Sequence, residues 1–132
     1  MPASDQLSTL AAVALGGAIG AVARYGITVV ALGAFPRFGP AGTLIANVLG
    51  CGLIGVAMVL AQSQLLSELQ RQLCVTGFLG ALTTFSTYSY QTIELAREGR
   101  FALAMFNLLS NLVLGFLAVA VGLWLGRRIV GG

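Results

Sequence analysis

The chain has 132 residues, of which 58% are hydrophobic and 8% are charged, and its mean hydropathy is +0.94. In soluble domains about a quarter of the residues are charged, so this composition excludes an ordinary soluble domain. The net charge is +3 and every basic residue is Arg, without the basic, aromatic-rich patch of a nucleic-acid-binding protein, so we expect no nucleic acid as partner.

Four apolar stretches are long enough to cross a lipid bilayer, which takes about 20 mostly apolar residues in a helix. They are residues 7–32, 41–61, 73–95 and 101–125. Segments this long and continuous predict helices and not the strands of a barrel. We therefore expect an all-α membrane protein, with residues 1–132 forming a single domain of four transmembrane helices. The N-terminus lacks the positive region of a signal peptide, so the first stretch is predicted to be a retained span.

The first two stretches each contain one strongly polar residue. Arg24 lies inside the first stretch, where its side chain either reaches the interface, lines an aqueous vestibule or lies between subunits. Asn47 lies inside the second stretch, where its amide either joins helices or serves a functional site. Glycines recur in both stretches and predict faces where helices pack closely.

The third stretch contains the segment GFLGALTTFSTYSY (77–90), which combines glycines with a run of hydroxyl-bearing residues. The glycines weaken a helix and the paired threonines Thr83 and Thr84 stiffen the chain, so a break is predicted between Gly80 and Thr84. Carbonyls freed by a break need a partner inside the bilayer, and hard cations favour such oxygens. The alternative is an unbroken helix whose hydroxyls bond to the preceding turn. Beyond the break, Phe85 and Tyr88 would share one helix face, beside the hydroxyls of Ser86, Thr87 and Ser89.

The fourth stretch contains Asn107, Ser110 and Asn111, and the two amides, four residues apart, share one helix face. No acidic residue lies at mid-depth in any stretch, which argues against a proton-coupled transporter. Cys51 and Cys74 lie in apolar sequence without metal-site spacing, so we interpret them as small buried residues.

The arginines give no preferred orientation in the membrane. Arg71, Arg127 and Arg128 belong to one side of a four-span topology, and Arg37, Arg97 and Arg100 belong to the other side. The number of Arg residues in the short loops sets the orientation of a membrane protein. Because the two sides have equal numbers, we expect the chain to insert in both orientations.

These motifs together resemble the Fluc/CrcB family of fluoride channels. The resemblance covers nearly the whole chain and rests on GGAIGAVARYGI (16–27), GTLIANVLG (42–50), GFLGALTTFSTYS (77–89), EGRF (98–101) and NLLSNLVLG (107–115). It implies a channel and not an enzyme, with no catalytic residues, that exports fluoride from the cytoplasm across the cytoplasmic (inner) membrane. It also implies an antiparallel, dual-topology homodimer, in agreement with the equal numbers of arginines on the two sides.

The resemblance further assigns site residues. The implied fluoride pore is lined by Asn47, Phe85, Ser86, Thr87, Tyr88, Asn107, Ser110 and Asn111. A sodium ion at the dimer centre is implied to bind the main-chain carbonyls of Gly80 and Thr83, at the break in the third helix. The sequence departs from the usual family pattern at Ala81, Tyr88 and Gln91, which stand in place of Gly, Phe and Glu. The alternative function is a small dual-topology multidrug exporter, but that family requires a Glu within the first span, where this chain has only Arg24.

Overall fold

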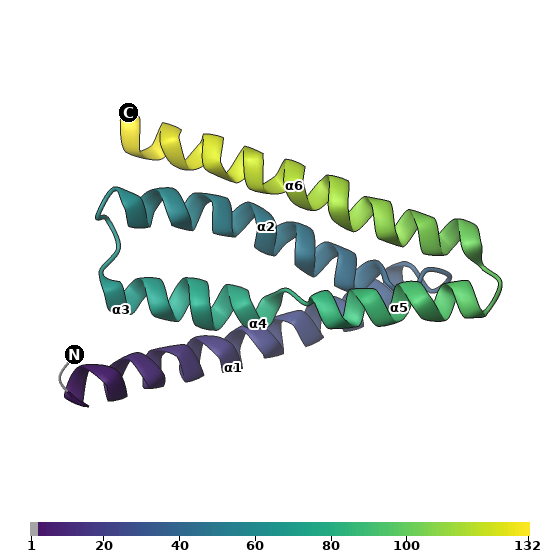
Figure 1. The fold of residues 1–132 in the computed structure, drawn as a ribbon, viewed down its shortest axis with the longest axis horizontal. Helices are drawn as coiled ribbons and strands as arrows, with labels where there is room; N and C mark the ends of the chain where they lie inside the picture. Colours follow the sequence, from purple (N-terminus) through teal and green to yellow (C-terminus); the bar gives the residue numbers. More distant parts are fainter. Residues whose placement is uncertain (1–2) are drawn as a thin grey trace.

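A computed structural model describes residues 3–132, and all regular structure among them is helical. The elements in chain order are α1 (Ala3–Ala34), α2 (Ala41–Gln62), α3 (Glu68–Arg71), η1 (Gln72–Leu79), α4 (Gly80–Leu82), α5 (Phe85–Arg97) and α6 (Phe101–Gly131). Figure 1 shows α2 and α6 side by side, with the α3-to-α5 segment running beside α2 and α1 crossing it obliquely.

Three of these helices are long and apolar enough to cross a membrane. They are α1, from Asp5 onward, α2 and α6. They confirm the predicted stretches 7–32, 41–61 and 101–125 as apolar helices and identify the chain as a multi-pass membrane protein. Most of their large apolar side chains are exposed on the single chain, as lipid-facing or subunit-facing side chains would be.

The stretch 73–95 is divided among three elements. η1 is a π-helical segment of eight residues, and α4 adds one short turn that ends at Leu82. Thr83 (φ −86°, ψ 155°) and Thr84 (φ −152°, ψ 114°) are both extended, and α5 begins at Phe85. Gly80, where the predicted break was to begin, is helical (φ −62°, ψ −33°). The interruption is therefore confined to the two threonines, whose β-branched side chains suit extended backbone.

Glycines set the distance between the packed helices. α2 packs chiefly against α6, and α1 packs chiefly against η1. A Cβ placed on Gly122 of α6 would collide with the carbonyl oxygen of Gly52 in α2, and one on Gly77 of η1 would lie 2.7 Å from the carbonyl oxygen of Val13 in α1. Glycines of the first two stretches pack as closely. A Cβ on Gly16 of α1 would collide with the carbonyl oxygen of Leu73 in η1, and one on Gly55 of α2 would lie 2.6 Å from the carbonyl oxygen of Val119 in α6, which confirms the predicted close-packing faces.

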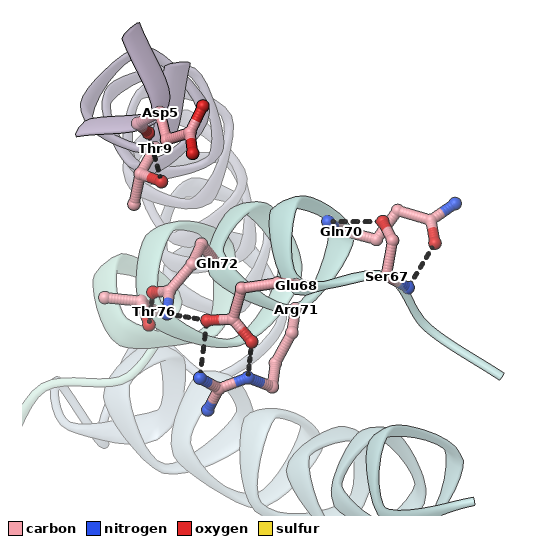
Figure 2. A network of polar contacts seen from close by, with 8 residues as sticks. All are labelled: Asp5, Thr9, Ser67, Glu68, Gln70, Arg71, Gln72 and Thr76. Carbon is pink, nitrogen blue, oxygen red and sulfur yellow. Dashed lines mark hydrogen bonds and ion pairs between the residues drawn. The ribbon is translucent and has the colours of Figure 1, made fainter. Parts of the chain in front are cut away.

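The charged residues gather at the two ends of the bundle. Figure 1 places the start of α1, the link from α2 to α3 and the end of α6 at one end, and the other two links at the opposite end. At the first end, Ser67 forms a capping box with Gln70, and Glu68 pairs with Arg71 at 2.6 Å, as Figure 2 shows. Hydrogen bonds from Arg71, and then from Gln72, hold the pKa of the Glu68 carboxyl below its ordinary value.

The Glu68–Arg71 pair contributes little to stability, because both side chains are exposed to solvent. A depressed carboxyl pKa stabilises the fold above the unfolded-state pKa, and this contribution is lost as the pH falls through the folded-state pKa. At the opposite end, Glu94 pairs with Arg97 at 3.1 Å.

We expect Gly122→Ala to destabilise the chain by about 1–3 kcal/mol, because its new methyl group overlaps the α2 backbone. Gly115→Ala in the same helix is the matched control, since its Cβ would lie 3.6 Å from the Cys51 Sγ, an ordinary contact. Thermal unfolding in detergent measures both variants. Equal midpoints for the two variants would contradict the close α2–α6 packing.

Candidate functional site

The extended residues Thr83 and Thr84 remove backbone hydrogen bonds that an unbroken helix would make. In an α-helix the Thr84 N–H would donate to the Gly80 carbonyl, four residues earlier. Here it donates instead to Oδ1 of Asn47 in α2, at 2.8 Å. Nδ2 of Asn47 donates to the Thr84 carbonyl at 3.3 Å. The Asn47 amide thus bonds both polar groups of the Thr84 backbone, as a neighbouring peptide group would.

Arg24 bonds a second group freed by the interruption. The Ala81 carbonyl would accept from the Phe85 N–H in a continuous helix. Here it accepts a hydrogen bond from Nε of Arg24 in α1, at 3.0 Å. Arg24 is half-buried, so its side chain reaches inward to the interruption and does not extend to the end of α1.

α5 begins with a side-chain cap. The Thr84 Oγ1 accepts from the backbone N–H of Thr87 at 3.2 Å, which is the usual bond of a threonine N-cap. The same oxygen lies 3.0 Å from the Thr87 Oγ1 and 3.3 Å from the Ser86 Oγ. On the α2 side, a Cβ on Gly50 would collide with Cγ2 of Thr83, so this glycine makes room for the interruption.

A chain of side-chain hydrogen bonds extends from Asn47 to α6 and α5. Nδ2 of Asn47 donates to Oδ1 of Asn111 at 2.9 Å, and Nδ2 of Asn111 donates to Oδ1 of Asn107 at 3.1 Å. Nδ2 of Asn107 donates to the Thr92 Oγ1 at 2.8 Å, and that hydroxyl donates to the Tyr88 carbonyl at 2.8 Å. Asn107 is fully buried, and its partners supply the bonds that a buried amide requires. This chain fixes α5 against α6 and orients Asn47.

One cavity lies directly at the interruption. It has a volume of about 320 Å³, and we call it the Asn47 cavity. Its polar and aromatic lining consists of Asn47, Thr83, Thr84, Phe85, Tyr88 and Asn111. None of these side chains carries a charge, so the cavity offers hydrogen-bonding groups and ring edges without a fixed ion.

A second cavity lies on the α1 side of the interruption. It has a volume of about 280 Å³, and we call it the Arg24 cavity. Its polar and aromatic lining consists of Arg24, Tyr25, Thr28, Thr43, Thr84, Thr87 and Gln91. Thr84 lines both cavities, so the interruption lies between them. The Gln91 Oε1 atom is buried and has no hydrogen-bond partner in the described chain, which leaves it open to a donor such as water.

The two rings at the start of α5 differ in exposure. Phe85 is 77% exposed and Tyr88 is 5% exposed, with ring centroids 5.6 Å apart. The Tyr88 hydroxyl donates to the Leu108 carbonyl at 3.4 Å, a long and weak hydrogen bond. An aromatic ring carries partial positive charge at its edge, so both rings present surfaces that can face an anion.

The interruption places two helix ends next to each other. α4 ends at Leu82 and α5 begins at Phe85. A helix C-terminus carries partial negative charge and a helix N-terminus partial positive charge, so α4 favours a cation and α5 an anion. Among residues 3–132 no three His, Cys, Asp or Glu side chains are grouped to hold a metal ion.

The structure brings together some of the residues predicted for the pore and separates others. Asn47, Phe85, Tyr88 and Asn111 line the Asn47 cavity, and Thr87 lines the Arg24 cavity. Ser86 is exposed beside Thr84. Asn107 and Ser110 are buried between helices and line neither cavity, although Asn107 is joined to Asn47 through Asn111.

The sequence indicated Thr84 only as the end of the predicted break and Gln91 only as a departure from the family pattern, and it indicated no role for Thr92. Thr84 is the residue shared by both cavities, and its place just before Phe85 is typical of the N-cap of a resumed helix. Thr92 lies four residues after Tyr88, a spacing that places both residues on one helix face.

We expect Asn47→Leu to speed hydrogen exchange at the Thr84 amide by at least about fivefold, because losing a buried hydrogen bond costs about 1–3 kcal/mol. Asn47→Asp keeps an oxygen that can accept from the Thr84 N–H, so exchange in that variant stays close to that of the unmodified chain. Exchange measured by NMR in detergent separates the two. Equal exchange in both variants would show that Asn47 does not hold the interruption.

Comparison with known proteins identifies the family. The family model described as CrcB-like protein, Camphor Resistance (CrcB), matches residues 11–123. A protein of Salinibacter ruber named fluoride-specific ion channel FluC is 46% identical over 120 residues, covering 91% of this chain and 90% of its own length. Proteins with the same name from Acidobacterium capsulatum (45%; 89% and 95% covered) and Chloroflexus aurantiacus (43%; 92% and 97% covered) are similarly related. The chain therefore belongs to the CrcB family.

Proposed function

We propose that this chain is a fluoride channel, which lets fluoride leave the cytoplasm down its electrochemical gradient across the cytoplasmic (inner) membrane. The relatives named as fluoride-specific ion channels support fluoride as the ion. The single structural observation that carries the proposal is the pair of cavities on either side of Thr84, both of them lined in part by hydroxyl and amide side chains. No covalent bond is made or broken on this route, and we assign no catalytic residue.

The proposed route leads from the Arg24 cavity, past the hydroxyls of Thr84 and Thr87, into the Asn47 cavity. Fluoride is small and strongly hydrated, so hydrogen-bond donors must replace its water at each step. Ser86 and Thr87 follow the N-terminus of α5, whose partial positive charge favours an anion. In the Asn47 cavity the donors are uncharged, so the ion is bound weakly enough to leave. The edges of Phe85 and Tyr88 then face the ion.

Asn107, Ser110 and Asn111 act on this route in two different ways. Asn111 lines the Asn47 cavity and is a direct contact. Asn107 and Ser110 are buried behind it, where Asn107 orients Asn111 through a hydrogen bond of 3.1 Å. We therefore assign Asn107 and Ser110 positioning roles in this conformation, and keep Asn47, Phe85, Ser86, Thr87, Tyr88 and Asn111 as contacts of the ion.

We propose that η1, α4 and α5 together form a fourth, broken span. In Figure 1 these segments follow one another end to end, along the length of the neighbouring helices. The interrupted backbone would then lie at membrane depth, where it is tolerated only if protein or an enclosed cavity supplies its hydrogen bonds. Asn47, Arg24 and the two cavities supply those bonds, which supports this placement.

We also propose an antiparallel homodimer of chains inserted both ways up. Each end of the bundle carries three Arg and two acidic residues, for a net charge of +1 at each end, and Arg24 accounts for the rest of the +3 total. The two ends are therefore equal in acidic residues as well as in arginines. Phe85 is largely exposed on the single chain, so a partner subunit can complete the pore wall beside it.

The dimer centre is the proposed site of a structural sodium ion, held by the main-chain carbonyls of Gly80 and Thr83 from each subunit. The donor chemistry fits, because hard cations bind carbonyl oxygens. The Gly80 carbonyl lacks its usual helical donor, since the Thr84 N–H bonds Asn47, and Gly80 is exposed. When bound, the ion would supply positive charge opposite the negative ends of both α4 helices.

The direction of transport follows from acid–base chemistry and the membrane potential. HF is neutral and crosses lipid, and it dissociates inside the cell to leave fluoride behind. The potential drives an anion outward with about 2.3 kcal/mol per 100 mV, so a passive channel suffices for export. The exporter alternative has no comparable support, because α1 has no acidic residue between Gln6 and Ala34.

Asn47→Asp should lower fluoride efflux from liposomes by at least about a hundredfold. Two like charges about 4 Å apart near a protein surface repel by about 4 kcal/mol, and the anion must pass this carboxylate. Phe85→Ile keeps bulk but removes the positive ring edge, so its efflux should also stop. A fluoride electrode measures release, and a sizing column checks that each variant keeps the assembly of the unmodified protein. Unchanged efflux in Asn47→Asp would remove Asn47 from the pathway.

Tyr88→Phe tests whether the ring or the hydroxyl matters. The hydroxyl makes only a 3.4 Å hydrogen bond to Leu108, so we expect the Phe variant to conduct fluoride at least as fast as the unmodified chain. The same efflux assay gives the answer. A markedly slower Phe variant would mean that the hydroxyl is an essential donor.

Dual insertion is tested by labelling single cysteines from outside the cell. Gly39→Cys and Gly131→Cys lie in open space at opposite ends, and both are made in a chain in which Cys51 and Cys74 are replaced by Ala. Each site should be labelled in about half of the molecules, because the charge balance gives no preferred orientation. Complete labelling of one site and none of the other would rule out the antiparallel dimer.

A further inference from the structure

An apolar groove lies at the end of the bundle that carries the 35–40 link. It has a volume of about 520 Å³, and we call it the Phe38 groove. Its large lining side chains are Phe35, Phe38, Leu44, Ile45, Leu103 and Phe106. The rings of Phe38 and Phe106 meet edge to face, with centroids 5.4 Å apart. α2 and α6 both begin at this end, so the groove lies in the outer turns of the two membrane helices.

A second apolar cavity adjoins the groove. It has a volume of about 430 Å³, lies along the last turns of α1, and shares Phe35 and Ile45 with the Phe38 groove. The two hollows therefore lie on either side of the same pair of side chains. Both are lined almost entirely by apolar side chains, so each can hold an apolar group.

Arg37 lies at the tip of the turn that leads into the groove. The Phe38 N–H donates to the Phe35 carbonyl at 3.0 Å, which closes a tight turn with Arg37 between the two rings. Arg100 is held beside this turn, because its Nη2 donates to the Arg37 carbonyl at 3.3 Å. Both arginines are exposed.

The charges at this end leave Arg37 uncompensated. Glu94 pairs with Arg97 and Glu98 pairs with Arg100, each at 3.1 Å. Within the described chain the Arg37 guanidinium belongs to no ion pair. An unpaired cation thus lies in the chain between Phe35 and Phe38, two residues that line the apolar groove, at one end of the apolar helices α2 and α6.

We propose that the Phe38 groove and its neighbouring cavity bind an anionic phospholipid. Its acyl chains occupy the two apolar hollows and its phosphate pairs with Arg37. The lipid has both required parts, a negatively charged head and two apolar chains joined at one point. A zwitterionic phospholipid also has the chains but offers no net charge to Arg37, so the site prefers the anionic lipid.

Native mass spectrometry of the full-length protein with phosphatidylglycerol or phosphatidylcholine tests this proposal. The unmodified protein should retain phosphatidylglycerol in preference to phosphatidylcholine. Arg37→Gln should lower phosphatidylglycerol binding about fivefold, since one basic residue near an anionic headgroup contributes about 1 kcal/mol. Arg97→Gln removes the same charge at the same end but from a residue paired with Glu94, so it should retain the lipid. Equal losses in the two variants, or no preference between lipids, would overturn the proposal.

Leu44→Trp tests the groove separately, because the larger ring fills the Phe38 groove without changing charge. It should lower phosphatidylglycerol retention while the oligomeric state stays unchanged. If this variant instead dissociates the assembly and retains the lipid, the groove is covered by a second copy of the chain and the lipid proposal is wrong. Neither measurement depends on ion transport, so the result is independent of the proposed channel function.

Discussion

A backbone that leaves the helical path inside a membrane must find hydrogen-bond partners in the protein, because lipid offers none. We propose that Thr83 and Thr84 lie at membrane depth, and side chains from other helices bond the backbone groups that these two extended residues free. Asn47 in α2 bonds the N–H and the carbonyl of Thr84, and Arg24 in α1 bonds the carbonyl of Ala81. An interruption that needs two long-range partners costs free energy. Backbone of this kind is found mainly at functional sites.

The same partners explain how the site is assembled. Because Asn47 is bonded to Asn111 and through it to Asn107, the position of α6 sets the orientation of the amide at the interruption. Arg24 holds the α1 side, so both cavities are framed by residues that also stabilise the fold. The proposed route therefore has two parts. The Arg24 cavity, with its single guanidinium, attracts the anion, and the uncharged Asn47 cavity binds it weakly.

Much of this organisation was predictable from the sequence, because apolar length and glycine spacing are local signals. The spans around Arg24, Asn47 and Asn107 and the close packing of glycines in the first two stretches, such as Gly16 and Gly55, followed from such patterns. The role of Thr84 did not, since two residues of extended backbone depend on an asparagine 37 positions away, which no local pattern encodes. The burial of Asn107 behind Asn111 depends likewise on how α5 packs against α6. The family resemblance named the amides but not which of them faces the cavity.

Fluoride release from liposomes that contain the purified protein decides whether this protein conducts fluoride by itself, as a passive channel. The liposomes are loaded with potassium fluoride, and a fluoride electrode follows release after valinomycin is added to carry potassium outward. We expect rapid release that requires both the protein and valinomycin, because a channel moves the anion alone and charge must be balanced. Release no faster than from protein-free liposomes, with the protein shown to be folded and incorporated, would contradict the proposed channel function.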